Sequence, residues 1–216
     1  MHEFIQKYEA HFDKLVSIIC EIDISCCNAY NAVQYRYFRP IIQQNETSFV
    51  RAKYIRHPII EQINDSVEYI GNDIELTNTG INGMMLYGIN ASGKSSFMKS
   101  IGINIIMAQS GMYVPCPEFV FYPYKHIFTR ISGMDNIYKG MSSFTVEMTE
   151  LRNILQRCDS SSLVLGDEIC NGTELLSALA IVASSIDTLV KKRTVFIFAT
   201  HLHDLTKIGT VKQHID

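Results

Sequence analysis

The segment that most constrains this chain is the stretch LYGINASGKSSFMKS at residues 86–100. It holds two glycines, an alanine, four serines and two lysines between an apolar run and an amphipathic one. An ordinary connection from a strand to a helix needs only one or two small residues. So many of them beside Lys94 indicate that a large, negatively charged group comes close to the backbone here.

The order of residues from Gly88 to Ser95 matches the phosphate-loop pattern G-x-x-x-x-G-K-[ST]. The sequence predicts a buried strand at 83–88 and a helix at 95–109, which is the setting that this loop requires. Its N–H groups and the positive end of the helix would surround phosphates. We expect Lys94 to reach the β- and γ-phosphates and the Ser95 hydroxyl to coordinate Mg²⁺. A chance match is the alternative. The expected nucleotide contacts in this loop are Gly88, Ile89, Asn90, Ala91, Ser92, Gly93, Lys94, Ser95 and Ser96.

Acidic residues follow a second apolar run, LVLGDE at 163–168. Asp167 falls at the carboxyl end of a predicted strand, where open α/β sheets hold ligands, and would hold Mg²⁺. Glu168 is placed to orient or deprotonate the attacking water, which favours a hydrolase over a kinase. His201 ends the strand TVFIFATH, where a side chain can sense the γ-phosphate. Taken alone, an Asp-Glu pair or a histidine at a strand end is often only solvated. The functional interpretation of both therefore depends on the phosphate loop.

Strands alternate with helices from residue 83 onward, which predicts an α/β fold with a mainly parallel sheet covered on both faces. A long helix at 1–35 and short β-rich pieces at 36–80 precede this part. The further predicted elements are one or two strands at 119–131, strands at 161–169 and 193–201, and helices at 143–158 and 173–192.

Composition excludes several classes of protein. The net charge is -3, with the basic residues spread along the chain, so strong autonomous binding to nucleic acid or an anionic membrane is not expected. The apolar stretches fall short of a membrane span, and charged residues occupy the first 20 positions, unlike a signal peptide. Six cysteines without a CxxC pair indicate buried free thiols in a reducing, intracellular compartment. His201 and His203 are wrongly spaced for a metal site on one helical face.

Seven motifs together resemble one family. They are RHPIIEQ, YIGNDIEL, GINASGKSS, IFTRI, SSFTVEMTELRNIL, LVLGDEICNGT and FATHLHDL. They occur in the order found in the ATPase domain of the MutS family of DNA mismatch-repair proteins, and SFTVEMTE resembles the mismatch-repair branch. The resemblance implies an ABC-type ATPase (a P-loop NTPase) that binds ATP and Mg²⁺. It divides the chain into residues 1–35, the helical end of a lever region, and residues 36–216, the ATPase domain.

The resemblance also implies roles in a dimer with a second copy or a paralogous subunit. Ser142 would contact the γ-phosphate bound by the other chain. Tyr69 would stack on adenine, unless it is a packed core aromatic, with Ile70 and Asn72 lining that pocket. The segment that passes between subunits would comprise Asn171, Gly172 and Thr173.

Departures from the family pattern mark an outlying subgroup. GPNMGGKST is here GINASGKSS, and DEIGRGTS is here DEICNGTE, so Asn171 replaces an arginine and Glu174 a serine. The chain also has no Phe-x-Glu wedge for reading mismatched DNA. We therefore expect a truncated module, with mismatched double-stranded DNA bound by other domains.

Two alternatives remain open at this point. One is an ABC-type DNA ATPase of the recombination-suppressing or chromosome-organising kind, although the short interval between Lys94 and Asp167 leaves no room for an inserted coiled coil. The other is a non-catalytic, nucleotide-gated interaction module.

Overall fold

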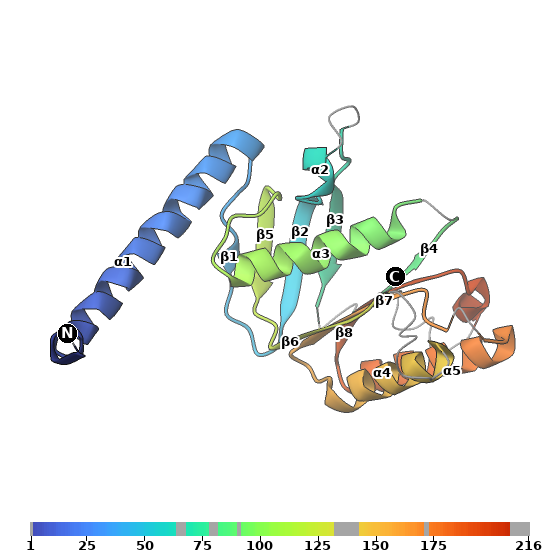
Figure 1. Ribbon diagram of the computed structural model, residues 1–216. Coiled ribbons are helices and arrows are strands. Elements are labelled where there is room, and N and C mark those ends of the chain that lie inside the picture. Colours follow the sequence, from blue (N-terminus) through green and yellow to red (C-terminus); the bar gives the residue numbers. More distant parts are fainter. Residues whose placement is uncertain are drawn as a thin grey trace.

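The computed structural model describes residues 2–63, 68–77, 82–89, 92–131, 143–170 and 173–207. Two four-stranded sheets and the helices between and beside them form a layered α/β fold (Figure 1). Within these residues, no helix is both long and apolar enough to cross a membrane.

One sheet, called here the N-terminal sheet, is mixed. Its strands, in order, are β1 (Ile41–Ile42), β5 (Glu118–Tyr122), β2 (Phe49–Ile55) and β3 (Asn72–Leu76). Strand β2 runs antiparallel to β5 and β3, while β1 and β5 are parallel. The sequence predicted short β-rich pieces at 36–80 without a strand direction, so the mixed pairing and the place of β5 in this sheet come from the structure alone. In the described part of the connection from β2 to β3 lies the four-residue helix α2 (Ile60–Ile63), which is too short for the crossover that parallel neighbours need.

The other sheet, called here the parallel sheet, confirms the expectation of a mainly parallel sheet from residue 83 onward. It has the order β4 (Gly83–Tyr87), β8 (Val195–Thr200), β7 (Ser162–Asp167) and β6 (His126–Arg130), and every pairing is parallel. Every residue of β7 and β8 is buried, as expected for central strands covered on both faces.

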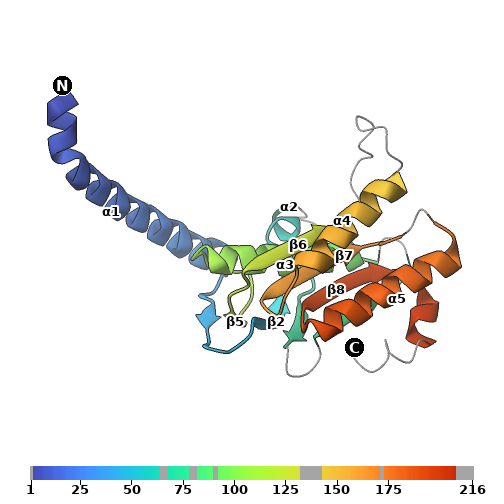
Figure 2. The ribbon, with the colours of Figure 1, turned by 90° about the horizontal axis from the view of Figure 1, so that it is seen from below.

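Helices cover both faces of the parallel sheet (Figures 1 and 2). Helix α3 (Lys94–Gln109) lies between the two sheets, and its Ile101 belongs to a core that also contains Phe121 of β5 and Leu165 of β7. Helices α4 (Ser143–Arg157) and α5 (Leu175–Lys191) lie on the opposite face, where Ile186 packs in a second core with Phe196. A short 3₁₀ helix, η2 (His203–Lys207), follows β8.

The predicted strand region at 119–131 divides between the two sheets. Strand β5 belongs to the N-terminal sheet and β6 to the parallel sheet, so the chain changes sheets at residues 123–125. Gln109, the last residue of α3, fixes this crossing by two hydrogen bonds to Tyr124. Its Oε1 accepts the Tyr124 N–H at 2.8 Å, and its Nε2 donates to the Tyr124 carbonyl at 3.1 Å.

Helix α1 (His2–Tyr35) confirms the predicted leading helix and extends away from the body of the protein in both views (Figures 1 and 2). Residues 9–27 are all exposed. Contacts to the body lie near its C-terminal end, where Asn28 Nδ2 donates to the Gly111 carbonyl at 3.0 Å and Asn28 Oδ1 accepts the Tyr113 N–H at 2.7 Å. Arg56 Nη2 donates to the carbonyl of Arg36, just after the helix, at 2.9 Å. The domain division proposed at this point stays a prediction.

All six cysteines are free, but only three are buried as expected. Cys116, Cys158 and Cys170 lie in the cores, where apolar neighbours surround them. The expectation was wrong for the other three, Cys20, Cys26 and Cys27, which are exposed because α1 stands away from the body.

Candidate functional site

Three strands bring the sequence motifs to one edge of the parallel sheet. Strand β8 lies between β4 and β7, and its Ala199 is opposite both Leu86 of β4 and Asp167 of β7. The strands are parallel, so the phosphate loop after β4, the acidic pair at the end of β7 and His201 after β8 all lie at the carboxyl edge. Such an edge is where open α/β sheets bind ligands.

The phosphate loop is held by its own lysine. Lys94 Nζ donates to the carbonyl oxygens of Gly88 at 2.7 Å and Ile89 at 2.9 Å. At Gly88 an added Cβ would come within 2.8 Å of Ser92 Oγ, so a side chain there would require the Ser92 hydroxyl to move. Gly93, the N-cap of α3, has φ 90°, a left-handed conformation that favours glycine.

The remaining loop residues surround the start of α3. Ser95 and Ser96 are partly buried in its first turn, where the helix dipole is positive. Ser92 and Ile89 are exposed, and the Ser92 N–H donates to the Ile89 carbonyl at 3.3 Å. Asn90 and Ala91 lie outside the described residues.

The acidic pair divides into a buried and a partly exposed carboxylate. Asp167 is only 8% exposed at the end of β7. Glu168 has φ 51°, and its N–H donates to the Ala199 carbonyl at 2.8 Å, which fixes the start of the turn against β8. The Glu168 side chain meets His201, and Glu168 Oε1 lies 3.0 Å from His201 Nε2. The structure therefore brings these two predicted site residues into contact.

Of the residues predicted to line the base pocket, Tyr69 contacts α3. Tyr69 is partly buried, burial raises its pKa, and its hydroxyl contacts Ser100 of α3. Ile70 is 78% exposed. The side-chain amide of Asn72 donates to the Ile70 carbonyl at 3.3 Å, which shapes the turn before β3. Tyr69 is thus near the helix that begins at the phosphate loop, and its role in stacking on a base stays a prediction.

The residues predicted to act between subunits are described only in part. Ser142, Asn171 and Gly172 lie outside the described residues. Thr173 is partly buried, and the exposed Glu174 is the N-cap of α5.

Two features of this edge were missed from the sequence. The rings of Tyr87 and His203 stack at a centroid distance of 5.5 Å, which joins the end of β4 to the segment after β8. Glu147 of α4 is buried, and its Oε1 accepts the Cys170 N–H at 2.9 Å. Glu147 lies in the quoted stretch SFTVEMTE, and an acidic residue on the buried face of that helix was the signal that could have found it.

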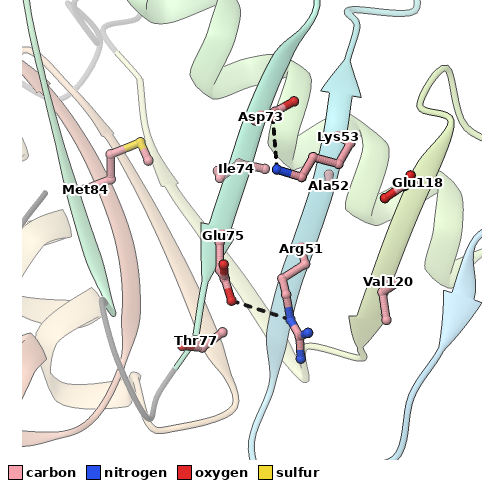
Figure 3. A pocket seen from close by; sticks show the side chains of 10 residues that line it. All are labelled: Arg51, Ala52, Lys53, Asp73, Ile74, Glu75, Thr77, Met84, Glu118 and Val120. Carbon is pink, nitrogen blue, oxygen red and sulfur yellow. Dashed lines mark hydrogen bonds and ion pairs between the residues drawn. The ribbon is translucent and has the colours of Figure 1, made fainter.

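A separate hollow of about 590 Å³ lies on the exposed face of the N-terminal sheet (Figure 3). Four of its charged side chains form two pairs: Arg51 Nε lies 3.7 Å from Glu75 Oε1, and Lys53 Nζ lies 3.0 Å from Asp73 Oδ2. No predicted site residue lines this hollow, so the carboxyl edge of the parallel sheet remains the candidate site.

Comparison with known proteins gives a consistent result. Residues 84–216 match the family model described as MutS domain V. A mitochondrial DNA mismatch repair protein mutS homolog of Sarcophyton glaucum is 39% identical over 93% of this chain and 21% of its own length. A putative DNA mismatch repair protein mutS homolog of Acanthamoeba polyphaga mimivirus is also 39% identical, over 98% of this chain and 22% of its own length. The DNA mismatch repair protein MutS of Staphylococcus aureus (strain JH9) is 35% identical over 96% of this chain and 24% of its own length. The chain thus spans between a fifth and a quarter of each of these relatives.

Proposed function

This chain belongs to the MutS family of DNA mismatch-repair proteins, and from that premise we propose that it is an ABC-type module that binds and hydrolyses ATP. The observation that supports the proposal is that three motifs follow neighbouring parallel strands at one sheet edge, with β8, which precedes His201, between β4 and β7.

Binding would use the loop from Gly88 to Ser96. The main-chain N–H groups and the N-terminus of α3 favour phosphate oxygens. Lys94 Nζ, which now donates to the carbonyls of Gly88 and Ile89, would exchange these acceptors for the β- and γ-phosphates. Tyr69, Ile70 and Asn72 would hold the adenine.

The donor set fits Mg²⁺. A hydroxyl at Ser95 and a carboxylate at Asp167 are the hard oxygen ligands that this ion prefers, and both belong to the same edge of the sheet. When bound, Mg²⁺ would neutralise charge on the phosphates.

Hydrolysis would depend on Glu168 and His201. The Glu168 carboxylate would orient the attacking water and accept its proton. His201, 3.0 Å away, would hold that carboxylate in place and face the γ-phosphate. A kinase directs its catalytic base toward a second substrate. Here the Glu168 carboxylate lies at the carboxyl edge of the parallel sheet, beside the proposed phosphate site, which favours hydrolysis.

The working unit would be a dimer with a second copy or a paralogous MutS-like subunit. Ser142 would contact the nucleotide of the other chain, and residues 171–173 would pass between the subunits. Nucleotide state would then control the binding of mismatched double-stranded DNA by the remainder of a longer protein, in an intracellular, reducing compartment.

Calorimetry with MgATP, combined with turnover measured over a range of protein concentrations, tests this function. We expect a binding heat, and ATP turnover per chain that rises with protein concentration because two chains form each site. Absence of a binding heat would contradict nucleotide binding. Turnover per chain that is independent of concentration, with the protein monomeric throughout, would contradict the dimer.

A further inference from the structure

The turn after β7 contains two strained residues. Glu168 has φ 51° and Cys170 has φ 65°, and neither is a glycine. Non-glycine residues adopt this left-handed region only where surrounding contacts hold them there. Glu168 is held on one side by its N–H bond to Ala199 of β8. The other end of the turn needs a contact of its own.

Glu147 of α4 supplies that contact. Glu147 is 8% exposed, and its Oε1 accepts the main-chain N–H of Cys170 at 2.9 Å. A hydrogen bond from a backbone N–H to an ionised carboxylate is stronger than one between neutral groups, and burial strengthens it further. Burial also raises the pKa of the Cys170 thiol to about 11, so the thiol stays neutral beside this carboxylate.

Arg130, the last residue of β6, balances the buried charge. Arg130 Nη2 lies 3.9 Å from the same Oε1 of Glu147, and Arg130 Nε lies 3.2 Å from Glu150 Oε2 one turn further along α4. The Arg130 side chain is 19% exposed and that of Glu147 10%, whereas that of Glu150 is 52% exposed. Of these two glutamates, Glu147 is the one that contacts both Arg130 and the turn that carries Glu168.

We propose that Glu147 is a positioning residue for ATP hydrolysis, because it fixes the turn at Cys170 and thereby the direction of the Glu168 carboxylate. The inference rests on the proposed function, which assigns Glu168 to the attacking water. It adds a physical connection between that carboxylate and α4, the helix that begins one residue after Ser142. A displacement of α4 would move Glu147 and so change its hydrogen bond to Cys170. The position of the start of α4 is therefore linked to the position of the Glu168 carboxylate.

Three variants separate positioning from a general structural role. Glu147→Ala removes the acceptor for the Cys170 N–H. Glu147→Gln keeps an oxygen acceptor at the same place but removes the charge opposite Arg130. Glu150→Ala is the matched control, because Glu150 lies on the same helix and pairs with the same arginine, whereas the Cys170 N–H donates to Glu147.

We expect Glu147→Ala to lower kcat by about 10-fold or more, the scale seen when a group that orients a reactive residue is removed, with the Kd for MgATP changed less than about twofold. Glu147→Gln should recover most of kcat, and Glu150→Ala should resemble the unaltered chain. Circular dichroism and thermal unfolding would establish that each variant is folded.

The outcomes distinguish this inference from the proposed function. Unaltered kcat in folded Glu147→Ala, with the unaltered chain active, would overturn the positioning role alone. A parallel loss of MgATP affinity and kcat, or equal losses in Glu147→Ala and Glu150→Ala, would also overturn it, because the role would then be structural. An unaltered chain that binds MgATP without turnover would overturn the hydrolytic function itself, and the positioning role with it.

Discussion

His201 Nε2 lies 3.0 Å from Oε1 of Glu168, so an imidazole at the end of β8 and a carboxylate after β7 contact each other directly across two neighbouring strands. Both side chains are about one-third exposed, at 36% and 31%, which leaves them accessible from the carboxyl edge of the sheet. The pair is therefore anchored by the sheet and open to a bound substrate.

Replacing Glu168 by glutamine should abolish most turnover while sparing binding. Glutamine keeps the shape but cannot accept a proton, so we expect kcat to fall by about 100-fold or more. The Kd for MgATP should change less than about threefold, because the loop proposed to bind the phosphates is untouched. Steady-state turnover and calorimetry measure the two quantities. The control is Glu174→Gln, which changes an exposed glutamate at the start of α5. Equal turnover in Glu168→Gln and the unaltered chain would contradict the role of Glu168.

Replacing Lys94 by alanine should weaken nucleotide binding itself. In the proposed function the ammonium donates charged hydrogen bonds to the phosphates, so we expect the Kd for MgATP to rise by about 10- to 100-fold. Calorimetry measures the change directly. Lys99→Ala is the matched control, because this lysine is exposed further along the same helix. If both variants lost affinity equally, the loss would be explained by a general electrostatic effect, and the specific role of Lys94 would be contradicted.

Stability should depend on the protonation of His57. Its Nδ1 accepts the N–H groups of Ile59 and Ile60, both at 3.2 Å, so only the neutral ring can cap this turn. Burial, and then the positive charge of Lys99, lowers the pKa of His57 below the ordinary 6.5. A folded-state pKa below the unfolded one means that the contribution to stability is present above about pH 6.5 and is lost as the pH falls toward the folded-state pKa.

His57→Asn keeps an oxygen acceptor but does not titrate, so it provides the reference. We expect the free energy of unfolding of the unaltered chain, relative to His57→Asn, to decrease below pH 6.5, with a slope that cannot exceed about 1.4 kcal/mol per pH unit for one group. Urea unfolding of both chains at a series of pH values measures this difference, in which the other titrating groups cancel. A difference that is constant from pH 8 to 5 would contradict the prediction.

The end of α5 offers a stabilising substitution. Arg193 has φ 54°, its N–H donates to the Val190 carbonyl at 2.9 Å, and the Thr194 N–H donates to the Leu189 carbonyl at 2.9 Å. This is a Schellman motif with arginine where glycine is usual. We expect Arg193→Gly to raise the free energy of unfolding by about 1 kcal/mol, because glycine adopts this conformation without strain.

Arg193→Ala is the control for that substitution. It removes the same side chain but retains a Cβ in the left-handed region, so no comparable gain is expected. Chemical unfolding of the three chains decides the matter, and an equal gain in both variants would attribute the effect to the lost side chain.

Local pattern predicted most elements of the fold. Continuous apolar runs predicted β7 and β8, because both faces of these strands are buried, and the spacing of apolar residues predicted α3, α4 and α5. The order β4-β8-β7-β6 and the crossing of the chain between sheets at 123–125 could not be obtained this way. Both depend on pairings between residues far apart in the sequence, such as Leu86 with Ala199.

The candidate site was predictable to a similar depth. The phosphate loop carries its chemistry in consecutive residues, and the acidic pair and His201 stand at strand ends. The contact between His201 and Glu168 follows from strand order, which no local pattern contains. The bond from Cys170 to Glu147 involves a turn with two left-handed residues that are not glycines, so the sequence could mark Glu147 by its place on the buried face of its helix but could not identify its partner.

The single-ended attachment of α1 has a geometric consequence. Its 34 residues extend for about 50 Å at 1.5 Å per residue. Among the described residues, the bonds of Asn28 and Arg56 hold the end nearest the body, and a rotation of about 5° there moves the opposite tip by about 4 Å, in simple proportion to that length. Movements too small to disturb the packing around α3 are thus magnified into displacements as large as a side chain.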